Sequence, residues 1–147
     1  MTKMEWYGDE KIKNVRAALP IAIKKACIIV EASAKEYSPV GVYAKGTGRV
    51  GGNLKGSITH TAGAESGRVG TNVDYAPHVE FGTRPHVIKV KNAKILSDGV
   101  SFFGKEVNHP GTAAQPFLRP AADKNRARVA REIGVIIGHA VEVGGKR

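Results

Sequence analysis

The sequence is poor in cysteine, in aromatic side chains and in long apolar runs, and each shortage excludes a class of protein. Cys27 is the single cysteine, which excludes an internal disulfide framework and a cysteine-rich zinc site. No stretch approaches the roughly 20 consecutive apolar residues that a membrane-spanning helix needs. No apolar run follows a basic start, so we expect no signal peptide and a protein made in a cytoplasm, with no membrane partner.

Acidic side chains are also scarce relative to basic ones. The chain has 13 Asp and Glu against 23 Lys and Arg, a formal net charge of +10. Such an excess is typical of proteins with a polyanion partner, most obviously nucleic acid. However, the basic residues are scattered, and aromatic residues make up only 6% of the chain, which leaves few stacking platforms for single strands. A solvated basic surface is the simpler explanation, although a duplex contacted only through phosphates needs no aromatics.

Helical patterns begin and end the chain, and the 147 residues predict a single domain of the α+β class. Apolar residues recur at steps of three and four over residues 9–36, so we expect a helix there. Pro20 lacks a backbone N–H and crowds the preceding turn, which predicts a kink or a break near this residue. A second amphipathic helix is expected over residues 115–143, packed on the sheet, with Pro116 in its first turn.

Strand-like segments fill the middle of the chain. Residues 37–53 are rich in glycine and lack periodicity, which indicates a loop. Residues 54–83 are expected to form an antiparallel meander of strands. Within it, residues 75–83, YAPHVEFGT, alternate between apolar and polar, which predicts a half-buried central strand with one face on the core. Gly82 would end this strand.

A projecting β-hairpin is expected over residues 84–110. Three short apolar runs lie there, and Asp98-Gly99 between two of them is a strong hairpin signal. Lysines make the hairpin basic, which is one way to keep an exposed sheet edge soluble. Alternatively, the hairpin is an arm that reaches a neighbouring chain or DNA. The lysines in question are Lys89, Lys91, Lys94 and Lys105.

The sequence offers little chemistry. Residues 46–51 spell GxGxxG, but the strand before and the helix after that a nucleotide site needs are not expected here. His78 and Glu80 imitate the H-x-E of zinc deaminases without the paired cysteines. His86 or His109 could join them, but a third ligand on a rigid element is missing, and surface histidines are the simpler alternative. We therefore expect no enzyme, no cofactor and no metal.

Several segments together resemble a known family. They are residues 75–88 (YAPHVEFGTRPHVI), the KNAKIL hairpin and residues 107–121 (VNHPGTAAQPFLRPA), preceded by SPVG and GTGRVGGNLKGSI. In this order they resemble the neck or tail-completion proteins of long-tailed double-stranded-DNA bacteriophages, the "gene product ten"-like family of the HK group. The resemblance spans residues 31–123. The glycine-rich expansion at residues 46–52 departs from the family pattern, whose loop is shorter.

The resemblance implies a structural virion protein, localised in the neck or tail and assembled in the cytoplasm of a bacterial host. Its members form rings that join head to tail around the DNA channel. We expect a homo-oligomeric ring, six-fold by the symmetry of the tail, with twelve-fold as the alternative. Expected partners are neighbouring neck, head-closure and tail proteins, with non-specific contact to packaged DNA. The alternative function is a basic nucleic-acid-binding module that acts through phosphate contacts.

On this resemblance, polar residues around the central strand and the hairpin would face a neighbouring subunit, and apolar residues of the two signature segments would form the core. The expected interface residues are His78, Glu80, Thr83, Arg84, Lys89, Lys91, Lys94, Lys105 and Arg119. The expected residues of the structural motif are Tyr75, Val79, Phe81, Gly82, Pro116, Phe117 and Leu118.

Overall fold

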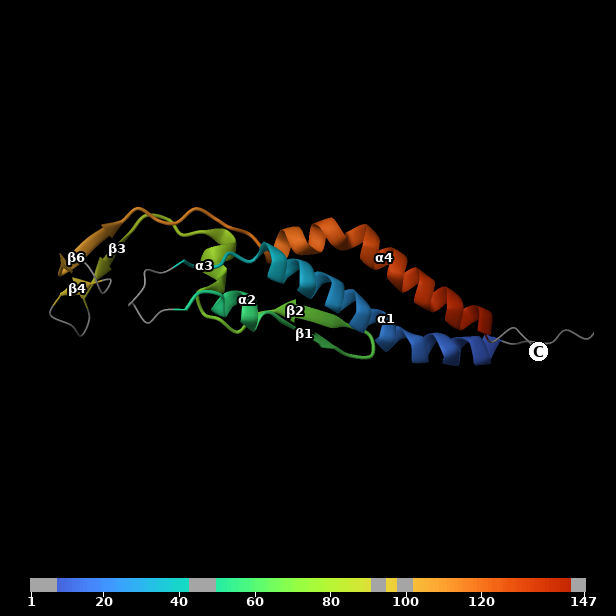
Figure 1. Ribbon diagram of the computed structural model, residues 1–147. Coiled ribbons are helices and arrows are strands. Elements are labelled where there is room, and N and C mark those ends of the chain that lie inside the picture. Colours follow the sequence, from blue (N-terminus) through green and yellow to red (C-terminus); the bar gives the residue numbers. More distant parts are fainter. Residues whose placement is uncertain (1–7, 43–49, 91–94, 98–101, 144–147) are drawn as a thin grey trace, which may run out of the picture.

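The computed structural model describes residues 8–42, 50–90, 95–97 and 102–143, and the chain within these ranges is elongated (Figure 1). Two long helices lie side by side at one end, and a β arm projects at the other. The predicted α+β class is confirmed, with a long helix first, small antiparallel sheets between and a long helix last. The strands of the described residues form three separate two-stranded sheets.

Helix α1 spans Gly8–Tyr37 and confirms the first predicted helix. Acidic Asp9 and Glu10 occupy its first turn and Lys35 its last, which suits the positive and negative ends of the helix dipole. The helix runs on through Pro20, so the predicted break is absent. Figure 1 shows the ribbon of α1 changing direction in its N-terminal half, as a proline inside a helix is expected to cause.

Helix α4 spans Leu118–Val143 and lies along α1 (Figure 1). Polar contacts fix the pair, because the buried Asn125 Nδ2 donates to Ser33 Oγ at 2.7 Å and Lys25 Nζ lies 2.6 Å from Glu132 Oε2. The helix begins three residues later than predicted, so Pro116 precedes it and Pro120 lies in its first turn. A proline there removes only an N–H that has no partner within the helix.

The start of the predicted meander is wrong. Residues 53–57 form a short helix, α2 (Asn53–Ser57), and only then does strand β1 (Thr59–Ala62) begin. Gly52, at φ 95°, precedes α2 in a conformation that favours glycine, and Ser57 Oγ donates to Leu54 O at 2.8 Å. Strand β2 (Gly67–Gly70) pairs with β1 antiparallel, as expected of a hairpin.

The predicted central strand is wrong, because Ala76–Phe81 form a helix, α3. Pro77 lies near the start of the helix, where its fixed φ is suited to the first turn. Ala76, Val79 and Glu80 point to the protein interior at spacings of three and four, whereas Phe81 is 71% exposed. The meander therefore has two strands. The segment predicted as its central strand forms a helix of less than two turns.

The projecting arm is confirmed in outline. Strand β3 (His86–Lys89) pairs antiparallel with β6 (Glu106–His109), a strand that the sequence did not predict. Further out, β4 (Leu96–Ser97) pairs with β5 (Phe102–Gly104). The Asp98-Gly99 turn, Lys91, Lys94 and the glycine-rich loop at residues 43–49 lie outside the described residues.

One compact core holds α1, α2, α3 and the start of α4 together. Phe117 and Ile58 are its largest fully buried side chains. Half-buried Val69 of β2 and Leu118 of α4 pack against it, so the sheet and the last helix meet here. The buried cluster consists of Ala34, Leu54, Ile58, Ala76, Phe117 and Ala121.

Candidate functional site: a projecting arm and the clamp at its base

The arm leaves the body through a single crossing of two chain segments, which we call the clamp. Thr83 N–H donates to Thr112 O at 2.9 Å, and Thr112 N–H donates to Thr83 O at 3.1 Å. Thr83 Oγ1 also accepts from the Thr112 N–H at 2.9 Å. Two residues that are 29 positions apart are thereby held in one antiparallel bridge, and everything between them belongs to the arm.

Two glycines make the clamp sterically possible. Gly82 has φ 72° and Gly111 has φ 87°, a region that side chains other than glycine rarely adopt. A Cβ on Gly82 would lie 2.6 Å from Thr112 O, and one on Gly111 would lie 2.3 Å from Thr83 O. Both glycines are therefore required by conformation and by the close approach of the opposite chain.

Glu80 fastens the clamp to α4. Its carboxylate is buried and accepts three backbone N–H groups at the start of the helix, from Phe117 at 2.7 Å, Leu118 at 3.0 Å and Arg119 at 2.9 Å. Burial raises the pKa of the Glu80 carboxyl, but these hydrogen bonds and the nearby Arg119 charge lower the pKa by more, so it lies below its ordinary value. Glu80 acts as an N-cap supplied from a different helix.

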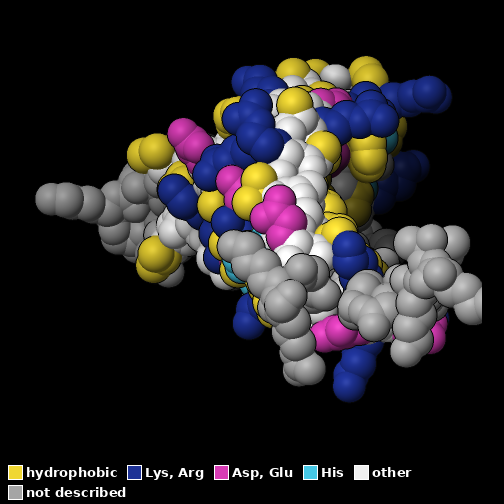
Figure 2. All heavy atoms as spheres, turned by 90° about the vertical axis from the view of Figure 1, so that its right-hand side faces the viewer, with side chains coloured by type: hydrophobic (Ala, Val, Ile, Leu, Met, Phe, Trp, Pro, Cys, Tyr) yellow, Lys and Arg dark blue, Asp and Glu magenta, His cyan; other side chains and the backbone are white. Residues whose placement is uncertain are grey.

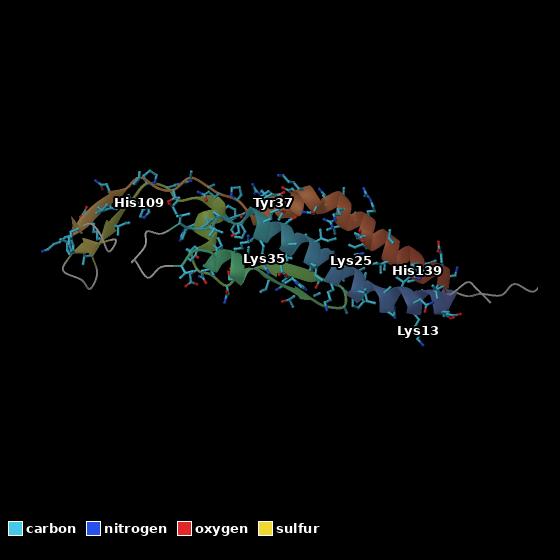
Figure 3. The ribbon with its side chains drawn as sticks, viewed as in Figure 1. Lys13, Lys25, Lys35, Tyr37, His109 and His139 are labelled. Atoms are coloured by element: carbon cyan, nitrogen blue, oxygen red, sulfur yellow. The ribbon has the colours of Figure 1, made fainter. Side chains whose placement is uncertain are left out.

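Two histidines face each other where the arm begins. His86 and His109 are opposite residues of β3 and β6, and their ring centroids lie 5.1 Å apart. His86 Nδ1 lies 2.9 Å from Arg84 O, and His109 Nδ1 accepts the Gly111 N–H at 3.1 Å. Figure 3 marks His109 on the arm, far from His139 on α4. The pair orders the base of the arm, next to the clamp.

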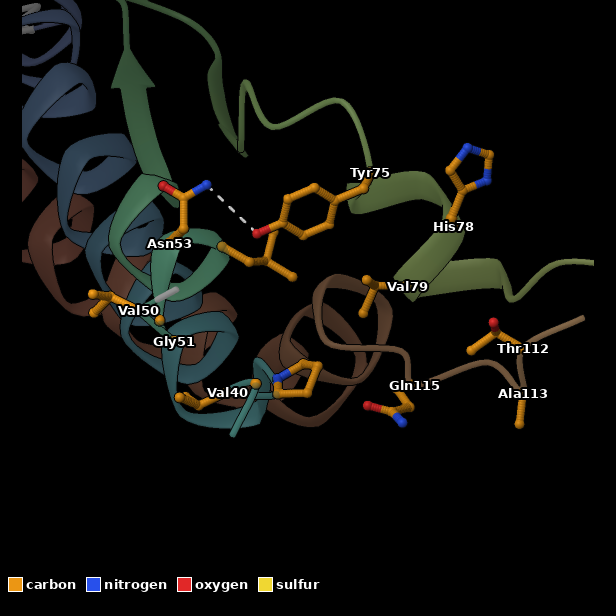
Figure 4. Close-up of a pocket in the computed structure, with 14 residues that line it drawn as sticks. Val40, Val50, Gly51, Asn53, Tyr75, His78, Val79, Thr112, Ala113 and Gln115 are labelled. Atoms are coloured by element: carbon orange, nitrogen blue, oxygen red, sulfur yellow. Dashed lines mark hydrogen bonds between the residues drawn. The ribbon is translucent and has the colours of Figure 1, made fainter. Parts of the chain in front are cut away.

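A groove of about 1100 Å³ opens beside the clamp (Figure 4). Its walls come from the loop after α1, from α2, from the start of α3 and from the chain that returns from the arm. Tyr75 reaches across from α3 toward Asn53, whose Nδ2 lies 3.5 Å from the Tyr75 hydroxyl. The described residues that line the groove are Pro39, Val40, Gly41, Val50, Gly51, Gly52, Asn53, Leu54, Tyr75, His78, Val79, Thr112, Ala113 and Gln115, and none of these carries a charged side chain.

Large apolar side chains are exposed on both the arm and the groove. On the arm, Phe102 is 75% exposed, and Val87, Ile88 and Ile95 are also accessible. At the groove, Tyr75 is 45% exposed, and Val40 and Val50 are exposed as well. Where such side chains form a contiguous patch, they mark an interaction surface.

The structure corrects several of the predicted positions. Glu80 is buried in the clamp and does not face outward. Phe81 and Tyr75 are exposed, and Pro116 is exposed before α4, so these three do not belong to the core. The alternation of residues 75–83 misled because a helix places every third or fourth residue inward, not every second.

Other predicted positions agree with the structure. Phe117 is fully buried, Val79 and Leu118 pack against the core, and Gly82 ends its element with a positive φ. His78, Arg84, Lys105 and Arg119 have exposed side chains, Thr83 lies in the clamp, and Lys89 Nζ lies 3.2 Å from Glu106 Oε2 on the arm. Whether they contact another subunit stays a prediction.

Sequence reasoning missed the groove and half of the clamp. Gly111 and Thr112 fall between the predicted hairpin and the predicted last helix, although a glycine directly after Pro110 is a signal of a special backbone conformation. Val40, Val50 and Asn53 come from segments without periodicity, so no pattern could bring them together.

Metal chemistry and membrane insertion find no support in the described part of the chain. No group of three or more His, Cys, Asp or Glu side chains there could hold a metal ion. None of its helices has the length and apolar character needed to cross a membrane. Comparison with protein families, curated proteins and solved structures finds no match to this chain.

Proposed function

We propose that this chain is a structural subunit of an oligomeric ring in the neck of a tailed bacteriophage, where it joins head to tail around the DNA channel. The observation that carries the proposal is the clamp. The two segments with the strongest family resemblance, residues 75–83 and 109–121, are distant in sequence and supply both halves of this crossing. Their signature residues thus share one structural task, which is to hold a projecting arm.

An arm of this kind suits an assembly protein. A two-stranded ribbon is marginally stable alone in water, and here its large apolar side chains are exposed. The groove beside the clamp is a second apolar surface on the same molecule, at a different place. Two different surfaces that bind each other give a head-to-tail contact, which closes into a ring when the rotation allows.

The test is the mass of the purified protein by light scattering at rising concentration, together with electron micrographs of the same samples. We expect closed rings, six-fold or twelve-fold, in equilibrium with the monomer. A protein that stays monomeric over the whole range, with no rings in the images, would contradict self-assembly into a ring.

A basic stripe on α4 favours the second candidate, a nucleic-acid-binding module. Lys124, Arg128 and Arg131 are exposed and follow one another at spacings of four and three, so they share one side of the helix. Figure 2 shows Lys and Arg side chains spread over the end of the molecule where α4 ends, with Asp and Glu side chains between some of them. Phosphates of a duplex are the chemistry that such a stripe would bind.

A further inference from the structure

The two histidines at the base of the arm make hydrogen bonds of opposite direction. A backbone N–H can only donate, so His109 Nδ1, which lies 3.1 Å from the Gly111 nitrogen, must be without a proton. A carbonyl oxygen can only accept, so His86 Nδ1, which lies 2.9 Å from Arg84 O, must carry one. The neutral pair therefore has one defined arrangement, with the ring proton of His109 on Nε2 and that of His86 on Nδ1.

A second proton affects the two rings differently. A charged histidine ring carries a hydrogen on both nitrogens. His86 keeps its hydrogen bond to the Arg84 carbonyl in this form, because its Nδ1 donates in both states. His109 loses its hydrogen bond, because a proton on Nδ1 would face the hydrogen of the Gly111 N–H. The ring centroids also lie 5.1 Å apart, so positive charges on both rings repel each other.

Gly111 connects His109 to the clamp. A Cβ on Gly111, whose φ is 87°, would lie 2.3 Å from Thr83 O, so the glycine is in close contact with this carbonyl. The next residue, Thr112, donates its N–H to the same carbonyl at 3.1 Å. The hydrogen bond from Gly111 to His109 therefore fixes the peptide group between Pro110 and Gly111, directly before the Thr83–Thr112 bridge. Protonation of His109 removes this support from one side of the bridge.

Histidine is the kind of side chain that responds to mild acid. Carboxylates, lysines and arginines ordinarily titrate outside the range from about pH 5.5 to 7.5, and histidines titrate within it. The charged neighbours of the pair on the described arm are of the first kinds. The backbone of Arg84 lies against Gly111, Lys105 directly precedes β6, and Lys89 and Glu106 form an ion pair at the other end of the β3–β6 ladder.

The body keeps its own links to the clamp in this pH range. Helix α3 brings Glu80 and the exposed His78 to the clamp, and α4 brings Arg119. Burial raises the Glu80 pKa, but the N–H groups of α4 and the Arg119 charge lower the pKa by more, so the carboxylate stays ionised. A proton on His60 adds an attraction to the Glu31 carboxylate beside it. Mild acid thus removes a hydrogen bond at the base of the arm and none of the three that hold Glu80 to α4.

We propose that the pair of His86 and His109 is an acid-sensitive lock on the arm. With neutral rings, His109 holds the turn at Gly111, and the Thr83–Thr112 bridge is closed. With protonated rings, the turn is released, and the arm is held less firmly while the body stays folded. The lock acts within one chain, so it does not depend on the ring-forming function proposed above.

Hydrogen exchange of the full-length protein, followed by NMR at pH 7.5 and 5.5 and corrected for the intrinsic pH dependence of exchange, tests the lock. We expect the protection of the Gly111 and Thr112 amides to fall by about fivefold at pH 5.5, the effect of one lost hydrogen bond, with α1 unchanged. His109→Asn should remove this response, because the side-chain oxygen of Asn accepts the N–H two residues on and does not titrate. His78→Asn, the same change at an exposed histidine outside the arm, is the matched control and should keep the wild-type response.

The ring nitrogens give a second readout that needs no variant. In the wild-type protein at pH 7.5, the nitrogen NMR signals of His109 should show its proton on Nε2. A proton on Nδ1 would overturn the proposal, and so would equal protection of the Gly111 amide at both pH values. A response as large as that of the wild type in His109→Asn, or its loss in His78→Asn, would assign the pH dependence to another group and overturn the proposal as well.

Discussion

Glu80 shows how much one side chain decides in this protein. A buried carboxylate is costly to a fold unless it is well hydrogen-bonded, and here three N–H groups at the start of α4 provide those bonds. The same residue ties α3, the clamp and α4 to one point. Its role belongs to the fold of the chain itself, and an exposed residue such as Phe102 is the better probe of the proposed subunit contacts.

Replacement of Glu80 by Gln should destabilise the monomer. The amide is neutral, and its NH₂ would face N–H groups, so at least one hydrogen bond to a charged acceptor is lost without a substitute. We expect the free energy of unfolding to fall by about 1–3 kcal/mol in urea denaturation. Glu65→Gln, at the exposed turn between β1 and β2, is the matched control and should change it by less than about 0.5 kcal/mol. Equal effects would show that the carboxylate of Glu80 has no special role.

Acid should destabilise the protein through lowered carboxyl pKa values. Lys35 first and then His60 lower the pKa of Glu31, and the pKa of Glu80 is lowered as described above. A lowered folded-state pKa gives stability that is fully present above the unfolded value of about 4.3 and is lost as pH falls through the folded value. Unfolding free energies measured from pH 7 to 3 should therefore decline below about pH 4. Glu80→Gln should show a shallower decline, and an identical profile would contradict this assignment.

At the scale of elements, sequence patterns predicted the long helices and failed on the short ones. Residues 9–36 give many turns of consistent periodicity, so chance agreement is small, and the helix formed as expected. Residues 75–83 give one or two turns, and there the periods of strand and helix cannot be told apart. Tertiary contacts favour the helix in this segment: Ala76 and Val79 pack in the core, and Glu80 accepts hydrogen bonds from the start of α4.

The clamp and the groove were beyond sequence patterns for a related reason. They depend on contacts between residues far apart in the chain, such as Thr83 with Thr112. The family resemblance identified both signature segments as important, but it did not predict that they contact each other. The need for glycine at position 111 is explained by its positive φ together with the close approach of the Thr83 carbonyl, which only the structure shows.

Gly111→Ala should open the clamp. The new Cβ would meet the Thr83 carbonyl, and the residue would also have to hold a positive φ. Gly104→Ala is the matched control, because Gly104 also has a positive φ (84°) but no atom of the described residues within 4 Å of the added Cβ. Hydrogen exchange should show faster exchange of the Thr83 and Thr112 amides in Gly111→Ala than in Gly104→Ala, with α1 unchanged. Similar exchange in both variants would mean that the close contact is not needed.

At the scale of the whole molecule, the response to salt separates the two candidate functions. Contacts to phosphates weaken steeply with salt, whereas apolar contacts between subunits do not. The slope of log K against log salt is negative. If α4 binds duplex DNA, replacing Lys124, Arg128 and Arg131 together by Gln should reduce the magnitude of this slope by about 3. Fluorescence anisotropy with a labelled duplex at several salt concentrations measures it. An unchanged slope would contradict the assignment to this stripe.

The clamp also has a mechanical consequence. Both segments of the arm join the body next to the Thr83–Thr112 bridge, so a load on the arm would be carried along the backbone on either side of it. Immediately behind it, the Gln115 N–H is held by Val79 O at 2.8 Å and the start of α4 by Glu80. These hydrogen bonds hold the two segments against α3 and the start of α4. A load on the arm would therefore pass to α3 and to the start of α4, which these hydrogen bonds join.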